Sequence, residues 1–202
     1  MYHDDVKAIH TAFIHQPGDT LECVVRFVLA TIQQQFHTVG NILDEWDRLG
    51  YQAPTMWGMK KDGVKFIKRN KVRLAAQLQN ANPAEAIDIL LTVPGLNTVK
   101  AGFAVQLLGM GAGCIDTHNA RMYGIDVAAF KITPKHTMKT RNAKIRSYLA
   151  LCDGLGGSPA LWDVWCNFIA DKQWKHWEDA GEVSEMHVNW TVGKLKHEED
   201  RW

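Results

Sequence analysis

Long apolar runs, closely spaced cysteines and an excess of one charge sign are all missing from this 202-residue chain. No stretch is long and apolar enough to span a bilayer, and residues 1–13 lack the basic start and apolar core of a signal peptide. We therefore expect a cytoplasmic protein with no membrane partner.

The cysteines are few and widely separated, at positions 23, 114, 152 and 166. They form no CxxC pair and no close grouping with histidines, so a zinc site of the finger type is not expected. We expect reduced thiols, no metal ligands and no cofactor.

The charges nearly cancel, with 23 Lys and Arg against 22 Asp and Glu and a formal net charge of +1. A nucleic-acid partner would therefore have to be met by a local basic face, because the field of the whole molecule is too weak to steer it. The densest basic stretch contains Lys60, Lys61, Lys65, Lys68, Arg69, Lys71 and Arg73. It suits phosphate contacts, for which we select Lys71 and Arg73, or equally an ordinary solvated helix face.

Apolar residues recur at three- and four-residue spacing through most of the chain, whereas alternating strand patterns are scarce. Cap-plus-proline signals at Asn82-Pro83, Thr133-Pro134 and Ser158-Pro159 mark helix starts. The pattern predicts an all-α protein with loops at 51–61 and 109–115. The expected helices cover 4–15, 20–36, 39–49, 62–69, 71–80, 83–92, 98–108, 117–123, 134–152 and 159–177.

Pro94-Gly95-Leu96-Asn97 separates two of these helices. Gly95 can take a positive φ, and Asn97 is among the few other residues that tolerate a left-handed backbone. A sharp reversal there leaves N–H groups of the turn and of the next helix unpaired at the positive end of a helix dipole. Such a hairpin is a phosphate site, and Lys100 follows it closely.

Asp116 stands where the helix expected at 117–123 should begin. One interpretation is an N-cap, which aspartate forms well without any other role. The other is catalytic, because a carboxylate can stabilise positive charge on a sugar whose glycosidic bond is breaking. Both can hold, since a capping aspartate is held rigidly.

Residues 91–101 and the segment Ile115-Asp116-Thr117-His118 with Arg121 resemble the helix-hairpin-helix DNA glycosylases, the endonuclease III-like (HhH-GPD) superfamily. That family has an LPGVG-type hairpin followed about two dozen residues later by a VDTH-type aspartate, and here Pro94 and Asp116 are 22 positions apart. The resemblance is strong over 82–124, weaker over 20–80, and beyond 124 rests on helical character alone.

The resemblance implies one two-lobed helical unit over 1–202, with the active-site cleft between the lobes. The approximate lobes are 20–124 and 1–19 with 125–202. Duplex DNA would be the partner of a monomer in the cytoplasm, in a nucleoid or a phage-infected cell.

The resemblance also assigns roles to single residues. The hairpin would grip a DNA phosphate, often with a bound monovalent cation, while Asp116 acts beside a flipped nucleotide with His118 as its neighbour. Gln35 would fill the gap that the flipped base leaves. The implied DNA-binding set at the hairpin is Gly95, Leu96, Asn97, Thr98 and Lys100.

The chain departs from the family pattern in two ways, at the hairpin and at the lysine that follows it. Asn97 replaces the second hairpin glycine, and Val99 occupies the position of the Schiff-base lysine found in bifunctional members. Lys100 is displaced by one residue, which rotates its side chain about 100° around a helix. We therefore expect water to hydrolyse the N-glycosidic bond of the base, without lyase activity. An iron-sulfur cluster is not expected, because the family's cluster loop needs four closely spaced cysteines near the C-terminus and only Cys152 and Cys166 lie in that part of the chain.

Three functions fit these residues. The first is a DNA glycosylase that excises a damaged or modified base from duplex DNA. The second is an enzyme on the same scaffold that modifies bases, as in the hypermodification of phage pyrimidines. The third is a non-catalytic DNA-binding module, against which the retention of Asp116 argues.

Overall fold

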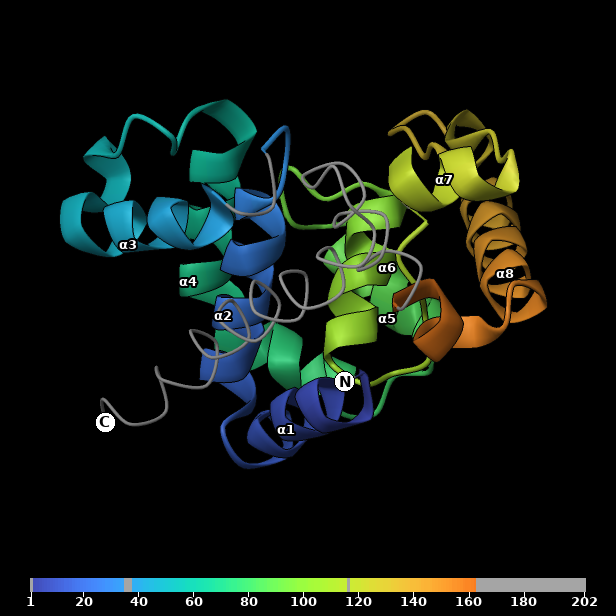
Figure 1. The fold of residues 1–202 in the computed structure, drawn as a ribbon, viewed down its shortest axis with the longest axis horizontal. Helices are drawn as coiled ribbons and strands as arrows, with labels where there is room; N and C mark the ends of the chain where they lie inside the picture. The colour runs from blue at the N-terminus through green and yellow to red at the C-terminus, as the bar shows by residue number, and fades with distance from the viewer. Residues whose placement is uncertain (1, 35–37, 116, 163–202) are drawn as a thin grey trace, which may run out of the picture.

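The computed structural model describes residues 2–34, 38–115 and 117–162. The described part is all-α and contains no strand. Figure 1 shows α3 at one end of the molecule and α7 with α8 at the other, with α2, α5 and α6 between them. The α-helices are α1 (Tyr2–His15), α2 (Pro17–Ala30), α3 (Val39–Leu49), α4 (Gly58–Leu78), α5 (Pro83–Leu90), α6 (Thr98–Leu107), α7 (Thr117–Tyr123) and α8 (Met138–Gly154), and two short 3-10 helices are η2 (Gly50–Gln52) and η3 (Val127–Phe130).

Two helices form the centre of the described core. On α2 the side chains of Leu21, Val24 and Val28 are fully buried, and α2 packs mainly against α4. On α6 every residue from Ala101 to Leu107 is buried, as expected of a helix that is apolar on all sides. Because burial of a large apolar side chain such as Phe103 or Leu107 contributes roughly 1.5–3 kcal/mol, α6 is fixed firmly in the core.

The sequence-based boundaries were wrong in two helices of the first half. The helix expected at 20–36 is α2, which starts at Pro17 and ends at Ala30, since Pro17 takes the first-turn position that suits proline. The helices expected at 62–69 and 71–80 are one helix, α4. Its buried face continues through Ile67, Leu74 and Leu78, and the side chain of Asn70 donates to the Phe66 carbonyl instead of ending the helix.

The capping signals had mixed outcomes. Asn82 forms the expected capping box with Glu85 at the start of α5. Thr133-Pro134 does not start α8, because the Thr133 N–H binds Nδ1 of His136 in a turn. Thr137 is the N-cap instead, and its hydroxyl accepts from the Thr140 N–H.

The expectation of two lobes with a cleft remains a prediction, as does the division between 20–124 and the terminal segments. Within the described residues, no helix has the length and apolar character needed to cross a membrane.

Candidate nucleic-acid interface at the α5–α6 hairpin

The hairpin joins α5 to α6 through a tight turn at Gly95. Gly95 has a φ of 88°, in the left-handed region that favours glycine, as the sequence predicted. The Leu96 N–H donates to the Val93 carbonyl at 3.1 Å and closes the turn. That amide is therefore occupied, and the Leu96 side chain is buried in the core.

Asn97 has a different role from the left-handed one that its residue type suggested. Its backbone is extended, with a φ of −100° and a ψ of −179°, and it is the N-cap of α6. Its side-chain oxygen accepts from the Lys100 N–H at 2.9 Å. A capping asparagine satisfies one orphan amide of the first turn and leaves others without a partner within the helix.

Two main-chain donors remain at the start of α6. The N–H groups of Thr98 and Val99 have no acceptor among the described residues. The Thr98 side chain faces inward, since its buried hydroxyl donates to the Phe130 carbonyl at 2.8 Å. Because Thr98 as a whole is 1% exposed, its main-chain N–H is buried as well, whereas the Val99 N–H belongs to a partly buried residue.

The start of α4 lies directly against the turn. A Cβ added to Gly63 would lie 2.4 Å from the Pro94 carbonyl oxygen, and one added to Gly95 would lie 3.2 Å from the Met59 carbonyl oxygen. These glycines let the two backbones approach closely. One side of the turn is thus covered by residues 59–63, while Asn97 is exposed.

Lys100 extends from the first turn of α6 toward the end of α2. Its Nζ donates to the Thr31 hydroxyl at 3.2 Å and lies 5.7 Å from the centre of the Phe103 ring. Thr31 is the C-cap of α2, where a positive charge interacts favourably with the helix dipole. The neighbouring Val99, at the expected lyase position, packs partly buried against the core.

Lys60, which the sequence placed in a basic stretch suited to phosphate contacts or to a solvated helix face, is buried. Its side chain is 2% exposed, and its Nζ is buried without a hydrogen-bond partner in the described structure. The Trp57 ring lies 5.6 Å from Nζ. Burial, and secondly the positive charge of Lys100, lower the pKa of Lys60. A buried amine without a partner is costly, so it calls for an explanation beyond packing.

Lys60→Met is expected to stabilise the fold by about 1–3 kcal/mol near neutral pH, because it removes an unsatisfied buried donor at similar volume. The lowered pKa means that the native state loses this proton before the unfolded state does. Wild-type stability should therefore rise, and the gain of Lys60→Met shrink, as the pH approaches 10.5. Urea unfolding of both proteins at several pH values measures this difference.

Lys68→Met on the exposed face of α4 is the control and should change stability by less than about 0.5 kcal/mol. A Lys60→Met protein that unfolds at lower urea than wild type would contradict the prediction.

Asp116 and Gln35 lie outside the described residues, and the side chain of His118 is likewise not described. The backbone of α7 begins at Thr117, the position expected from the sequence. The predicted roles of Asp116, Gln35 and His118 stay predictions.

The loop before Asp116 is held by buried polar side chains. The Gln106 side chain accepts from the Cys114 N–H at 3.0 Å and donates to the Ser158 carbonyl at 2.8 Å. The Tyr148 hydroxyl donates to the Gly113 carbonyl and accepts from the Ile115 N–H at 3.2 Å. Asn119 donates to the Cys114 carbonyl. The segment up to Ile115 is thus fixed to α6, α7 and α8, and a glutamine inside the apolar run of α6 was the sequence signal for this role.

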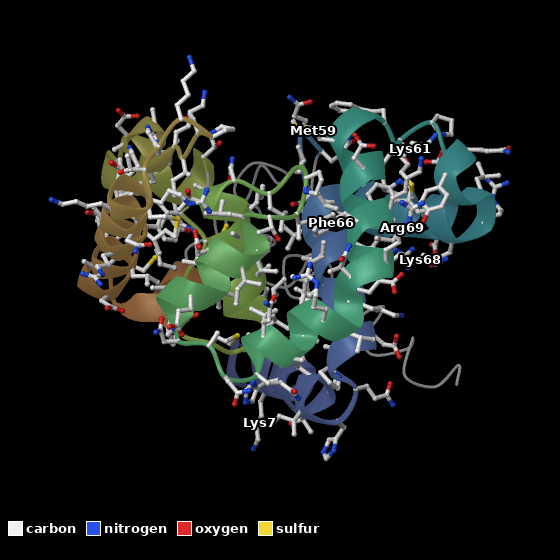
Figure 2. The ribbon with its side chains drawn as sticks, turned by 180° about the vertical axis from the view of Figure 1, so that it is seen from behind. Lys7, Met59, Lys61, Phe66, Lys68 and Arg69 are labelled. Atoms are coloured by element: carbon white, nitrogen blue, oxygen red, sulfur yellow. The ribbon has the colours of Figure 1, made fainter. Side chains whose placement is uncertain are left out.

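The basic stretch divides into paired and exposed residues on α4. The amine of Lys71 binds Asp19 and Glu22 of α2, and these contacts outweigh the effect of its burial and raise its pKa. Its charge is therefore already compensated. Arg73 is exposed and hydrogen-bonds to Asn70 and Gln77. We define the α4 basic face as Lys61, Lys65, Lys68, Arg69 and Arg73, and Figure 2 shows three of these side chains, Lys61, Lys68 and Arg69, along α4.

The described residues offer no group of three or more His, Cys, Asp or Glu side chains that could hold a metal ion. Cys152 is a free thiol. Burial raises the pKa of the Cys152 thiol to about 12, so it is not poised for reaction at neutral pH.

Comparison of the chain with protein-family models, curated proteins and solved structures finds no match.

Proposed function

We propose that this protein is a DNA glycosylase of the helix-hairpin-helix type, with a two-lobed fold. It would excise a damaged or modified base from duplex DNA by flipping the nucleotide and hydrolysing its N-glycosidic bond. The proposal rests on the sequence resemblance over 82–124, and the geometry of the hairpin is consistent with it.

The observation that supports it most is the start of α6. The unpaired N–H groups of Thr98 and Val99 lie at the positive end of a helix dipole, and Lys100 is in the same turn. Lys60 adds a second amine whose field reaches Lys100. This combination attracts a phosphate diester.

The chemical step is assigned to Asp116. As the bond between C1′ and the base lengthens, positive charge develops on the deoxyribose, and a nearby carboxylate stabilises it. The same carboxylate orients the water that attacks C1′ and accepts its proton. The departing base carries away the bonding electron pair, so no lysine adduct is required.

A panel of duplexes, each carrying one modified base, tests the function through detection of abasic sites. Turnover on at least one duplex, with the free base in solution, supports the proposal. Bases that are altered while still attached to the sugar would instead show a modifying enzyme. Binding without any chemical change in the whole panel would indicate a DNA-binding module.

The α4 basic face is expected to contribute phosphate contacts beside the hairpin. Lys68 is five residues beyond Gly63, or about 8 Å along the helix axis from the contact with the hairpin turn. Lys68→Ala and Arg69→Ala should each lower the slope of log affinity against log salt by about 1, because each removes one phosphate contact. Fluorescence anisotropy with a labelled duplex at several salt concentrations measures the slope.

Lys7→Ala is the matched control, since Lys7 is an exposed lysine on α1, away from the labelled α4 residues in Figure 2. It should leave the slope unchanged. If all three variants give the wild-type slope, the DNA lies elsewhere.

A further inference from the structure

A groove of about 550 Å³ lies where α5 packs against the end of α4 and against α8. Its described lining includes no residue of the turn at 94–97, so the groove is separate from the candidate nucleic-acid interface. Small-ligand sites usually have roughly 300–1,000 Å³ and combine apolar surface with a few convergent polar groups. The α5–α8 groove has this size and this mixed lining.

The α5 wall of the groove carries hydrogen-bond acceptors. Glu85 and Asp88 are three residues apart and therefore share one face of the helix. One oxygen of Glu85 accepts from the Asn82 N–H at 2.9 Å. One oxygen of Asp88 accepts from the Arg141 guanidinium at 2.6 Å. The second oxygen of each carboxylate has no partner among the described residues, so α5 offers two acceptors to a ligand.

The α8 wall carries donors. Asn142 and Arg146 both line the groove and are four residues apart, on one face of α8. The Arg146 side chain is exposed and has no hydrogen bond or ion pair to any described residue. A guanidinium presents its N–H groups in a planar arrangement that suits two neighbouring acceptors at once. Arg146 is therefore available to bind such a pair on a ligand.

Apolar side chains complete the lining. Ile145 is 1% exposed and Ile89 is partly buried, so both are fixed by the core and offer a firm surface to a flat ring. The two carboxylates are balanced by the guanidinium groups of Arg141 and Arg146. The groove therefore favours a neutral, planar ligand that has both donors and acceptors over a simple ion.

We propose that the α5–α8 groove binds a guanine base. Guanine is neutral and planar, with donors at N1 and at the N2 amino group and with acceptors at O6 and N7. The donors bind the open oxygens of Glu85 and Asp88, while O6 and N7 accept from Arg146, a pairing that arginine commonly makes with this base. Adenine fits less well, because its N1 atom is an acceptor that a carboxylate repels.

Two sources share this chemistry: a free guanine nucleoside, and an unpaired guanine in a DNA strand. The inference does not rest on the proposed function, because the groove consists of residues outside the hairpin and requires no chemical step.

Isothermal titration of the full chain with 2′-deoxyguanosine, and with a short single strand that has one guanine among thymines, tests the site. We expect 2′-deoxyguanosine to bind at least about fivefold more tightly than 2′-deoxyadenosine, the lower end for a bidentate contact. 2′-Deoxyinosine lacks the N2 amino group and 7-deaza-2′-deoxyguanosine lacks the N7 acceptor, so each should bind more weakly than 2′-deoxyguanosine. Tighter binding of the single strand than of the nucleoside identifies DNA as the source, and the reverse identifies a free nucleoside.

Arg146→Met should weaken the binding of 2′-deoxyguanosine by at least about fivefold. It should also remove the difference between 2′-deoxyguanosine and its 7-deaza analogue, because N7 has lost its donor. Lys139→Met is the matched control, since Lys139 is an exposed residue of α8 outside the groove lining, and it should keep the wild-type affinity. Both positions are exposed, so unfolding curves should match that of the wild type.

Equal affinity for 2′-deoxyguanosine and 2′-deoxyadenosine would overturn the inference, as would an absence of binding by both probes. An Arg146→Met protein that still distinguishes the 7-deaza analogue would overturn it as well. Base release from the duplex panel without any guanine binding would overturn the guanine site and leave the proposed function intact.

Discussion

Asp116→Asn is expected to lower the rate of base release by at least about 10²-fold, roughly the loss of one well-placed electrostatic stabiliser. Asparagine is an N-cap about as good as aspartate, so the start of α7 should be preserved while the negative charge is removed. Folding and DNA affinity should therefore stay close to wild type. Single-turnover kinetics on the best duplex of the panel measure the rate of base release, and an unfolding curve measures the stability of the fold.

Asp126→Asn is the matched control for this substitution. Asp126 is an exposed aspartate that also caps a short helix, where its side chain accepts from the Ala128 N–H at 2.9 Å. It should retain the wild-type rate. Equal rates for wild type and Asp116→Asn would remove Asp116 from the mechanism.

Gly63→Ala is expected to destabilise the protein by about 1–3 kcal/mol and to weaken DNA binding. The added methyl would lie 2.4 Å from the Pro94 carbonyl oxygen, a backbone atom, and 2.8 Å from a methyl of Leu29. The helix preference for alanine, worth at most about 1 kcal/mol, opposes this overlap but is the smaller effect. Because α4 must move away from the turn, the hairpin loses its support. Urea unfolding and duplex anisotropy report the two consequences.

Gly18→Ala provides the comparison within a helix that has room. The nearest atom to the added methyl there is 3.6 Å away, an ordinary contact. This variant should be as stable as wild type or up to about 1 kcal/mol more stable. If Gly63→Ala behaved in the same way, the close contact of α4 with the hairpin would be wrong.

Local rules predicted those features of the fold that depend on neighbouring residues. The Asn82 capping box, the positive φ of Gly95 and the start of α7 at Thr117 follow from side chains within a few positions. The continuity of α4 through Asn70 could not be predicted from neighbouring residues. Burial of one face of α4 against distant parts of the chain outweighed the weak helix preference of that residue.

The candidate site also combines features that neighbouring residues predict with features that depend on distant contacts. The hairpin was recognisable from Pro94 to Asn97, but Asn97 caps α6 where a left-handed turn residue was expected. A lysine pair such as Lys60-Lys61 indicates a solvated surface, and only the packing of α4 on a turn more than 30 residues away buries the first of them. Likewise, the acidic partners of Lys71 lie 52 and 49 residues earlier in the chain. Charge patterns in sequence do not reveal such pairings.

A crystal structure with a duplex that contains an abasic-site analogue tests the central claim most directly. The account predicts a phosphate oxygen within hydrogen-bonding distance, about 3 Å, of the Val99 amide. It also predicts the extrahelical sugar with its C1′ atom beside the Asp116 carboxylate. DNA bound on another face, or a C1′ atom remote from Asp116, would contradict it.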